Sequence, residues 1–272
     1  MNITNNKTGE YLYKYMPFNQ YSLQLLINQE FYLSSPDLLN DPFEGDFIIL
    51  NWSELYNEES YRLLLDKQKT YSNEWLQKHI RETNLKRWRE KESDFQNDLY
   101  EYLSGSIKRQ FGTTSFSRNC NSIDMWSHYA DSHKGFVIVF DYKSLSAYFL
   151  EDDIKFCKVE YDSMPEISVN KNNLTIVEPE LLLINKLPRW KKEKEVRIIS
   201  KHWSDSGYEN DFSRMIKFPK ESILGLIYGS RMTTENLLTI DRLFQTNSLE
   251  YKSYYSKKNN KRNKLLFVEM KI

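Results

Sequence analysis

The sequence is poor in several residue types, and each shortage excludes a class of protein. Cys120 and Cys157 are the two cysteines among 272 residues, and they make neither a disulfide framework nor a spacing typical of metal ligands. Only eight glycines and seven prolines are present, and no repeat or long linker divides the chain. No stretch approaches the roughly 18 uncharged apolar residues that a membrane span requires. The sequence therefore predicts no membrane association.

Net charge is also lacking, because 38 lysines and arginines balance 38 aspartates and glutamates. No overall field attracts the chain to nucleic acid or to an anionic membrane, so binding to either would need a local basic patch. The first residues, MNITNNKTGEYLYKYM, do not show the basic-then-apolar pattern of a signal peptide. We therefore expect a cytoplasmic protein.

Several familiar functional motifs are missing as well. The chain has no GxGxxG dinucleotide fingerprint, no GxxxxGK[ST] phosphate loop and no GxSxG nucleophile elbow. Neither cysteine has an obvious activating partner, which argues against thiol catalysis. Function must therefore be sought in less regular groupings of polar residues.

The composition that remains is that of a globular protein rich in aromatic rings. Apolar residues make up 40% of the chain and aromatic residues 15%, which favours a ring-rich core and surfaces that stack on planar ligands. The periodicity predicts that residues 1–272 form a single α+β domain with a mostly antiparallel, mixed β core and a helical insertion at about 50–110. The expected strands are 11–15, 31–35, 111–117, 136–140, 156–161, 195–200, 215–219, 223–229 and a closing hairpin. The expected helices outside the insertion are 18–30, 122–134, 178–190 and 233–245.

The segment NDPFEG, residues 40–45, groups polar side chains around a proline. In one interpretation it is a structural turn, in which Asn40 or Asp41 bonds to its own backbone and Gly45 eases the exit. In the other it is the polar lip of a pocket, with Asn40, Asp41 and Glu44 facing a ligand. The residue types alone leave both open.

A second candidate begins in the strand TTSFS, residues 113–117. Alternation along a strand places Ser115 and Ser117 on one face. Trp126 and Tyr129 follow closely, either as core anchors or as platforms for a planar ligand. His128 and His133 lie five residues apart with no third ligand nearby, so we predict no metal site.

The stretch WKKEKEVRI, residues 190–198, carries the densest charge. If it begins a strand, Lys191, Glu193, Glu195 and Arg197 share one face while Val196 and Ile198 point to the core. Neighbouring carboxylates separate their pKa values, as acid–base catalysis requires. We therefore name Glu193, Glu195 and Arg197 as candidate catalytic residues. A solvated strand face would show the same alternation.

Taken together, these blocks resemble a known family. The segments LYKY (12–15), FYLSSPDLLNDPFEG (31–45), SFS (115–117), MWSHYADSHKGFVIVF (125–140) and KLPRWKKEKEVRII (186–199) occur in the order expected for the bacterial domain of unknown function 2971, DUF2971. The resemblance spans roughly residues 11–230. It implies a cytoplasmic protein of a family suspected of roles in phage defence or in toxin-like systems.

The order of three further signatures is similar to that of ADP-ribosyltransferases. These enzymes carry a basic residue on a first strand, then Ser-x-Ser, then Glu-x-Glu, and here Lys14, Ser115-Phe116-Ser117 and Glu193-Lys194-Glu195 follow that order. The resemblance implies NAD as substrate, with Tyr15 or Phe116 stacking on nicotinamide. It also implies that Glu195 bonds the ribose 2′-hydroxyl, and that Glu193 takes a proton from the acceptor. The first-strand residue departs from the pattern, which has Arg or His.

Two other functions remain open. The chain could bind a nucleotide or nucleic acid by aromatic stacking without turning it over, using Lys186, Arg189, Lys191 and Lys192. It could instead be a metal-dependent nuclease that uses Asp41, Glu44, Glu193 and Glu195. The transferase hypothesis requires Lys14, Ser115 and Glu195 to line one pocket.

Overall fold

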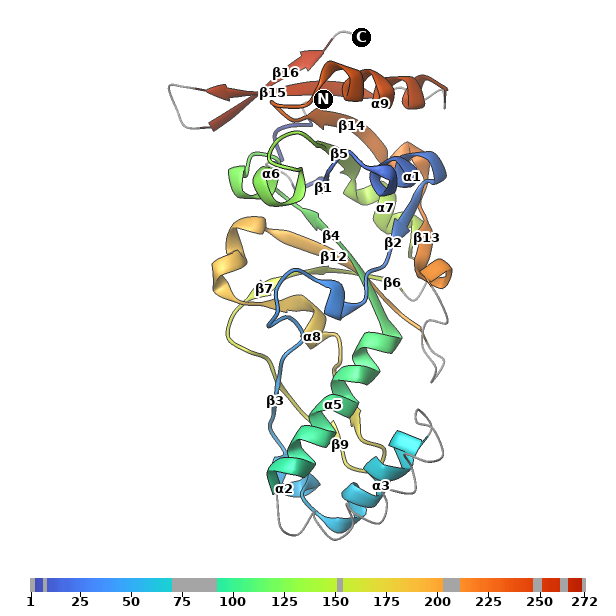
Figure 1. Ribbon diagram of the computed structural model, residues 1–272, viewed down its shortest axis with the longest axis vertical. Coiled ribbons are helices and arrows are strands. Elements are labelled where there is room, and N and C mark those ends of the chain that lie inside the picture. The colour runs from blue at the N-terminus through green and yellow to red at the C-terminus, as the bar shows by residue number, and fades with distance from the viewer. Residues whose placement is uncertain are drawn as a thin grey trace.

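The computed structural model describes residues 3–6, 9–69, 92–150, 154–202, 211–246, 251–259 and 264–270. The molecule is elongated, and a twisted sheet occupies its upper two thirds in Figure 1. The eight strands of this sheet follow the order β16–β15–β14–β5–β1–β4–β12–β6. They are β1 (Tyr11–Met16), β4 (Phe111–Ser117), β5 (Phe136–Asp141), β6 (Ile154–Lys158), β12 (Glu195–Lys201), β14 (Ile223–Tyr228), β15 (Lys252–Asn259) and β16 (Lys264–Met270).

Neighbouring strands of this sheet are antiparallel except for β14 and β15, which run parallel. The predicted α+β class with a mostly antiparallel, mixed core is therefore confirmed. Shorter strands form four separate pairs: β2 (Glu30–Tyr32) with β13 (Met215–Lys217), β3 (Ile48–Ile49) with β8 (Glu166–Ile167), β7 (Glu160–Tyr161) with β11 (Asn185–Lys186), and β9 (Val169–Asn170) with β10 (Thr175–Ile176).

Helices cover both faces of the upper sheet and form most of the lower body (Figure 1). Among the described residues the α-helices are α1 (Gln20–Asn28), α2 (Trp52–Leu55), α3 (Glu58–Lys69), α5 (Glu92–Gln110), α6 (Ile123–Tyr129), α7 (Tyr142–Tyr148), α8 (Leu181–Ile184) and α9 (Thr234–Thr246). The 3-10 helices are η1 (Pro36–Leu38), η2 (Pro188–Glu193), η3 (Asp211–Arg214) and η4 (Lys220–Ser222).

Alternation along β1 divides the upper core into two layers. Leu12 points to a cluster that α1, α7 and α9 complete, whereas Tyr13 and Tyr15 point to a cluster that contains Trp126 of α6. A third cluster lies in the lower body, where α5 contributes side chains at helical spacing: Phe95, Leu99, Leu103 and Ile107. These α5 residues agree with the amphipathic pattern expected for the insertion. The sequence spacing also places Leu85 and Trp88 on this amphipathic stripe, but these two lie outside the described residues.

Local signals account for several element boundaries. The side chain of Asn19 accepts a hydrogen bond from the backbone of Ser22, and the Ser22 side chain accepts one in return from the backbone of Asn19. This capping box starts α1. Similarly, the Ser122 side chain accepts from the backbone of Met125 and starts α6.

The predictions from the sequence were wrong for three helical segments. The helix expected at 178–190 is limited to α8, after which the chain forms β11 and then η2. Pro188 is the first residue of η2, because its fixed φ suits the first turn of a helix. Helix α6 ends before the expected residue 134, because Asp131, Ser132 and His133 all have positive φ. Helix α7 was not anticipated.

One irregularity in the sheet creates an opening. Strand β1 pairs with β4 where Tyr13 lies opposite Ser117, while further along β4 the bridge partner of Thr113 is Ser34. Between these two points, the edge of β4 at residues 114–116 is separated from β1. The strands diverge there, and the space between them becomes a cavity.

A stability experiment tests the upper core at Phe31. Its ring is fully buried, stacks on Phe218 at a centroid distance of 4.2 Å, and meets Phe116 and Phe140 edge to face. We expect Phe31→Ala to lower the free energy of unfolding by about 3–5 kcal/mol, measured by urea denaturation. Leu150→Ala is the control, because that side chain is 81% exposed, and its change should stay within about 0.5 kcal/mol. Equal effects for the two variants would contradict this account of the core.

Candidate functional site

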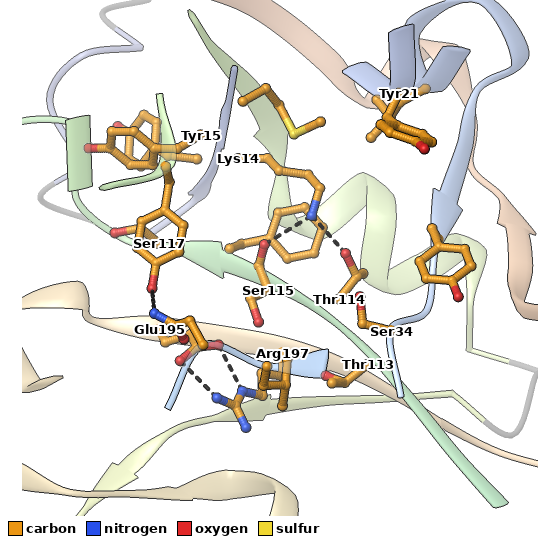
Figure 2. A pocket seen from close by; sticks show the side chains of 18 of the residues that line it. Lys14, Tyr15, Tyr21, Ser34, Thr113, Thr114, Ser115, Ser117, Glu195 and Arg197 are labelled. Carbon is orange, nitrogen blue, oxygen red and sulfur yellow. Dashed lines mark hydrogen bonds and ion pairs between the residues drawn. The ribbon is translucent and has the colours of Figure 1, made fainter. Parts of the chain in front are cut away.

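The cavity between β1 and β4 has a volume of about 880 Å³, within the range of about 300–1,000 Å³ typical of small-molecule sites. Its walls come from β1, α1, β2, the segment around Ser34–Asn40, β4, α6 and the start of β12. Figure 2 shows Lys14 crossing its centre, with Ser115 and Ser117 on one side and Glu195 and Arg197 below.

Strand register brings the candidate hydroxyls and charges to one face. Ser117 lies opposite Glu195, and Ser115 lies opposite Arg197, in the antiparallel pairing of β4 with β12. Directly opposed residues of antiparallel strands point to the same side of a sheet. Both pairs line the cavity, so their side chains meet at its floor.

Glu193 reaches this floor by a different route from the one expected. Strand β12 begins at Glu195, whereas Glu193 is the last residue of η2 and is separated from the strand by Lys194 at φ 47°. The prediction that Lys191, Glu193, Glu195 and Arg197 share one strand face was therefore wrong for the first two. Lys191 is exposed on η2. Glu193 is held by its carbonyl, which accepts a 2.6 Å hydrogen bond from Ser117 Oγ.

The carboxylates beside the cavity belong to a buried ion cluster, which we define as Glu44, Lys186, Glu193, Glu195 and Arg197. Lys186 Nζ lies 2.8 Å from Glu193 Oε2 and 3.3 Å from Glu195 Oε2. Arg197 Nε donates to Glu195 Oε1 at 2.8 Å, and the same guanidinium forms an ion pair with Glu44. Three carboxylates thus share two cations away from water. Such charges persist in an interior only when they are paired.

The cluster keeps Glu195 ionised. Burial by itself would raise the pKa of the Glu195 carboxyl, but attraction and hydrogen bonding by Arg197, with smaller contributions from Lys186 and Ser115, lower this pKa to about 2. Burial likewise opposes the charge of Arg197, yet its two glutamate partners raise its pKa. Glu195 is therefore a permanent anion at neutral pH, at the edge of the cavity.

Glu44 has the opposite tendency. Burial raises the pKa of its carboxyl more than Arg197 and Lys186 lower it, and the charge of Glu195 raises it further. Two nearby carboxylates of the same cluster thus have pKa values shifted in opposite directions, a pattern that is frequent at functional sites.

Tyr129 and Asn40 extend the polar wall. Tyr129 donates its hydroxyl proton to Glu193 Oε1 at 2.7 Å and accepts a hydrogen bond from the amide of Asn40. Burial, followed by the charge of Glu193, raises the pKa of the Tyr129 hydroxyl, which therefore stays protonated. Both side chains line the cavity.

Two predicted binding aromatics serve mainly as core. Trp126 does not line the cavity; its ring is fully buried, and its Nε1 donates to the carbonyl of Cys120 at 2.9 Å. Tyr15 lines the cavity but packs edge-on against Trp126 and donates its hydroxyl to the carbonyl of Asn119. Tyr15 can therefore present only part of its ring to a ligand.

The NDPFEG segment is a turn that supports the ion cluster. Asp41 Oδ1 accepts a hydrogen bond from the backbone of Phe43, and Gly45 has φ +86°, as the turn interpretation expects. Asn40 alone of its three candidate residues lines the main cavity. Asp41 pairs with Arg189, and Glu44 faces a separate pocket of about 50 Å³ while its carboxylate contacts Arg197. Asp41 and Glu44 therefore position other side chains and do not face a ligand in this cavity.

Sequence reasoning assigned Lys186 to the wrong environment and did not name several other residues of the site, among them Thr114 and Tyr161. Lys186 was assigned to a basic surface, yet it is only 4% exposed within the ion cluster. Thr114 accepts a hydrogen bond from Lys14, and the Tyr161 hydroxyl accepts one from the backbone of Glu195. None of these residues has a periodic relation to the Glu-x-Glu motif, so no signal in the sequence could have found them.

The described residues contain no group of three or more His, Cys, Asp or Glu side chains placed to hold a metal ion. Within the ion cluster, Lys186 and Arg197 occupy the space between the carboxylates, where a metal would have to bind. The four carboxylates of the nuclease hypothesis therefore do not form a metal centre here.

Fold and site together define an α+β protein with a ligand-sized cavity, floored by a buried cluster of charged residues. Residues 125–198 match the model of a family described as protein of unknown function (DUF2971), which confirms the resemblance drawn from the sequence. The matched part is shorter than the 11–230 expected, but it contains Tyr129 and the Glu-x-Glu motif. Neither a curated protein nor a solved structure matched the chain. The similarity to ADP-ribosyltransferases gains no support from these comparisons.

None of the helices in the described part of the chain is both long enough and apolar enough to cross a bilayer.

The depressed pKa of Glu195 makes a specific pH dependence testable. The pKa falls from 4.5 to about 2 on folding, so the ionised form contributes stability above about pH 4.5 that is lost as the pH drops toward 2. We expect Glu195→Gln to be less stable than the wild type at pH 6, by at most about 3 kcal/mol from this carboxylate. The gap should narrow on acidification, measured by denaturant unfolding at several pH values.

The matched control is Glu160→Gln, since Glu160 is exposed on β7. Its stability should follow the wild-type curve at every pH. A gap between Glu195→Gln and the wild type that stayed constant from pH 6 to pH 3 would contradict the assignment.

Proposed function

We propose that the cavity binds NAD and that the protein consumes it, as an ADP-ribosyltransferase or an NAD glycohydrolase. The observation that carries this proposal is that Lys14, Ser115 and Glu195 border one cavity although they lie far apart in the sequence. The volume of about 880 Å³ suits a ligand as large as a dinucleotide.

The chemistry asked of Glu195 is electrostatic. When the bond between nicotinamide and C1′ of the ribose breaks, the electron pair leaves with the nicotinamide and positive charge develops on the ribose. A carboxylate fixed beside that carbon stabilises the charge without reorganising. Glu195 is suited to this role because its low pKa keeps it ionised. Ser115, opposite Arg197 in the pairing of β4 with β12, makes a small contribution to the low pKa of Glu195.

Glu193 is the candidate proton acceptor. The nucleophile, either water or a group on an acceptor molecule, loses a proton as it bonds to C1′, and a carboxylate within hydrogen-bond reach accepts that proton. Tyr129 and Lys186 orient the Glu193 carboxylate, at 2.7 Å and 2.8 Å respectively. Asn40, Ser117 and the exposed edge of Tyr15 would contact the ligand, and Arg197 would position Glu195.

The proposed cellular setting is the bacterial cytoplasm, where NAD is available. Consumption of NAD would stop the metabolism of a cell, which fits a role in phage defence or as a toxin-like effector. This setting rests on the sequence resemblance and not on the cavity.

The direct test is nicotinamide release from NAD by the purified protein, followed by chromatography. We expect the wild type to turn over NAD. We expect Glu195→Gln to do so at a rate at least about 100-fold lower, which is about the effect of removing one group that stabilises a transition state. Ser115→Ala should also slow the reaction, because the Ser115 side chain lines the cavity and helps to keep the pKa of Glu195 low. Glu160→Gln, on the exposed β7, should turn over NAD as the wild type does.

If Glu195→Gln folds, as judged by its unfolding transition, and still releases nicotinamide at the wild-type rate, Glu195 is not the catalytic group.

One observation favours a second candidate function, nucleotide binding without turnover. Both oxygens of Glu195 already accept from cations, since Arg197 donates to Oε1 and Oε2 and Lys186 Nζ lies 3.3 Å from Oε2. This carboxylate charge is largely compensated, which suits a structural support better than a catalytic anion. Calorimetry would then detect NAD binding to both the wild type and Glu195→Gln, with no nicotinamide released by either.

Nucleic-acid binding has less support. Of the four basic residues invoked for it, Lys186 is buried in the ion cluster, Arg189 pairs with Asp41 and Lys192 pairs with Asp124. These side chains do not make the free basic surface that contact with phosphate backbones requires.

A further inference from the structure

The Lys14 amine differs from every other cation at the cavity. Lys186 and Arg197 face carboxylates, whereas the ion pairs found among the described residues do not include Lys14. Lys14 Nζ donates to Thr114 Oγ1 at 2.7 Å and to the carbonyl of Ser115 at 3.2 Å. Both acceptors are uncharged. Figure 2 shows the Lys14 amine with its two hydrogen bonds, to Thr114 and to Ser115.

The number of acceptors matches a neutral amine. A neutral lysine amine has two hydrogens and one lone pair, and an ammonium has three hydrogens. Thr114 and Ser115 accept two hydrogens, which leaves the lone pair of the neutral form directed elsewhere. The third hydrogen of an ammonium would lack a protein acceptor among these contacts, and a buried unpaired donor is unfavourable.

The surroundings weaken the charged form further. Burial lowers the pKa of Lys14 to about 8, and only the charge of Glu195 opposes this shift. Other charged groups that border the cavity are Glu30, Lys186, Glu193 and Arg197; the last three are tied to one another and to Glu195 through the ion cluster. The rings of Phe116 and Phe31, at 5.0 Å and 5.9 Å from Nζ, favour the cation weakly.

We propose that Lys14 is a nucleophilic amine that captures the carbonyl group of a small molecule in this cavity as an imine. The nitrogen lone pair attacks the carbonyl carbon and gives a carbinolamine. The carbinolamine then loses a water molecule, which is made of the former carbonyl oxygen and the two amine hydrogens, and the C=N bond forms. No oxidant or reductant is needed. Lysines freed of charge by a poorly hydrated environment are the residues that proteins use for this step. The amine borders the cavity in which we propose that NAD binds, but imine formation itself requires no NAD.

The test compares Lys14 with exposed lysines of the same molecule. The folded protein is treated with propanal and sodium cyanoborohydride, which fixes imines as secondary amines, and each modified lysine is quantified by peptide mass spectrometry. At pH 8 about half of the Lys14 amine is neutral, against about 0.4% for an ordinary lysine with a pKa of about 10.4. We expect Lys14 to react at least about tenfold faster than the exposed Lys171 and Lys191, because burial offsets part of this advantage. The rate should rise with a midpoint near pH 8.

Two variants distinguish a positioned amine from a merely accessible one. Thr114→Val removes one acceptor and should slow the reaction of Lys14 several-fold, whereas Thr114→Ser keeps the hydroxyl and should preserve the rate. The proposal is overturned if Lys14 in the wild type reacts no faster than Lys171 and Lys191. It is also overturned if inorganic pyrophosphate binds the wild type and Lys14→Arg equally well and blocks the reaction, since Lys14 would then be a charged anchor. Neither result depends on whether NAD is turned over.

Discussion

The pairing of buried charges around Arg197 is the constraint on which the site depends. Its guanidinium contacts Glu195 and Glu44 and also donates to the carbonyl of Leu183 at 2.6 Å. A charge removed from water is tolerated only with its partners in place, so one side chain fastens β12, the NDPFEG turn and α8 to one another. The same ion pairs hold the side chains at the floor of the cavity in place.

The ionic floor and the open strand edge have different consequences for chemistry. On the floor, carboxylates and cations neutralise one another, which suits the orientation of groups that must not move. Above it, where β1 and β4 diverge, the Lys14 amine donates hydrogen bonds only to uncharged acceptors, so no ion pair holds it in the charged form. The same cavity therefore contains, at Glu195, a carboxylate paired with cations and, at Lys14, an amine whose hydrogen-bond partners are uncharged.

Much of the fold could be predicted from local sequence patterns, but the site could be predicted only in part. Strands β1, β4 and β5 and helix α9 follow from alternation, helical spacing and caps, which are properties of neighbouring residues. The spacing of Ser115 and Ser117 placed both residues on one strand face, but the pairing of Ser117 with Glu195 depends on register between distant strands. Glu193 shows the limit of such reasoning, because Lys194 at φ 47° interrupts the alternation that seemed to join it to Glu195. Lys186 and Thr114 were missed because only tertiary contacts bring them to the cavity.

The junction between α5 and β4 has a mechanical meaning. The helix ends at Gln110 and the strand begins at Phe111, with no loop between them, and Arg214 donates to the carbonyls of both Lys108 and Phe111. Because no loop separates the two elements, α5 and the strand that carries Thr114 and Ser115 form one continuous segment that joins the helical body to the wall of the cavity.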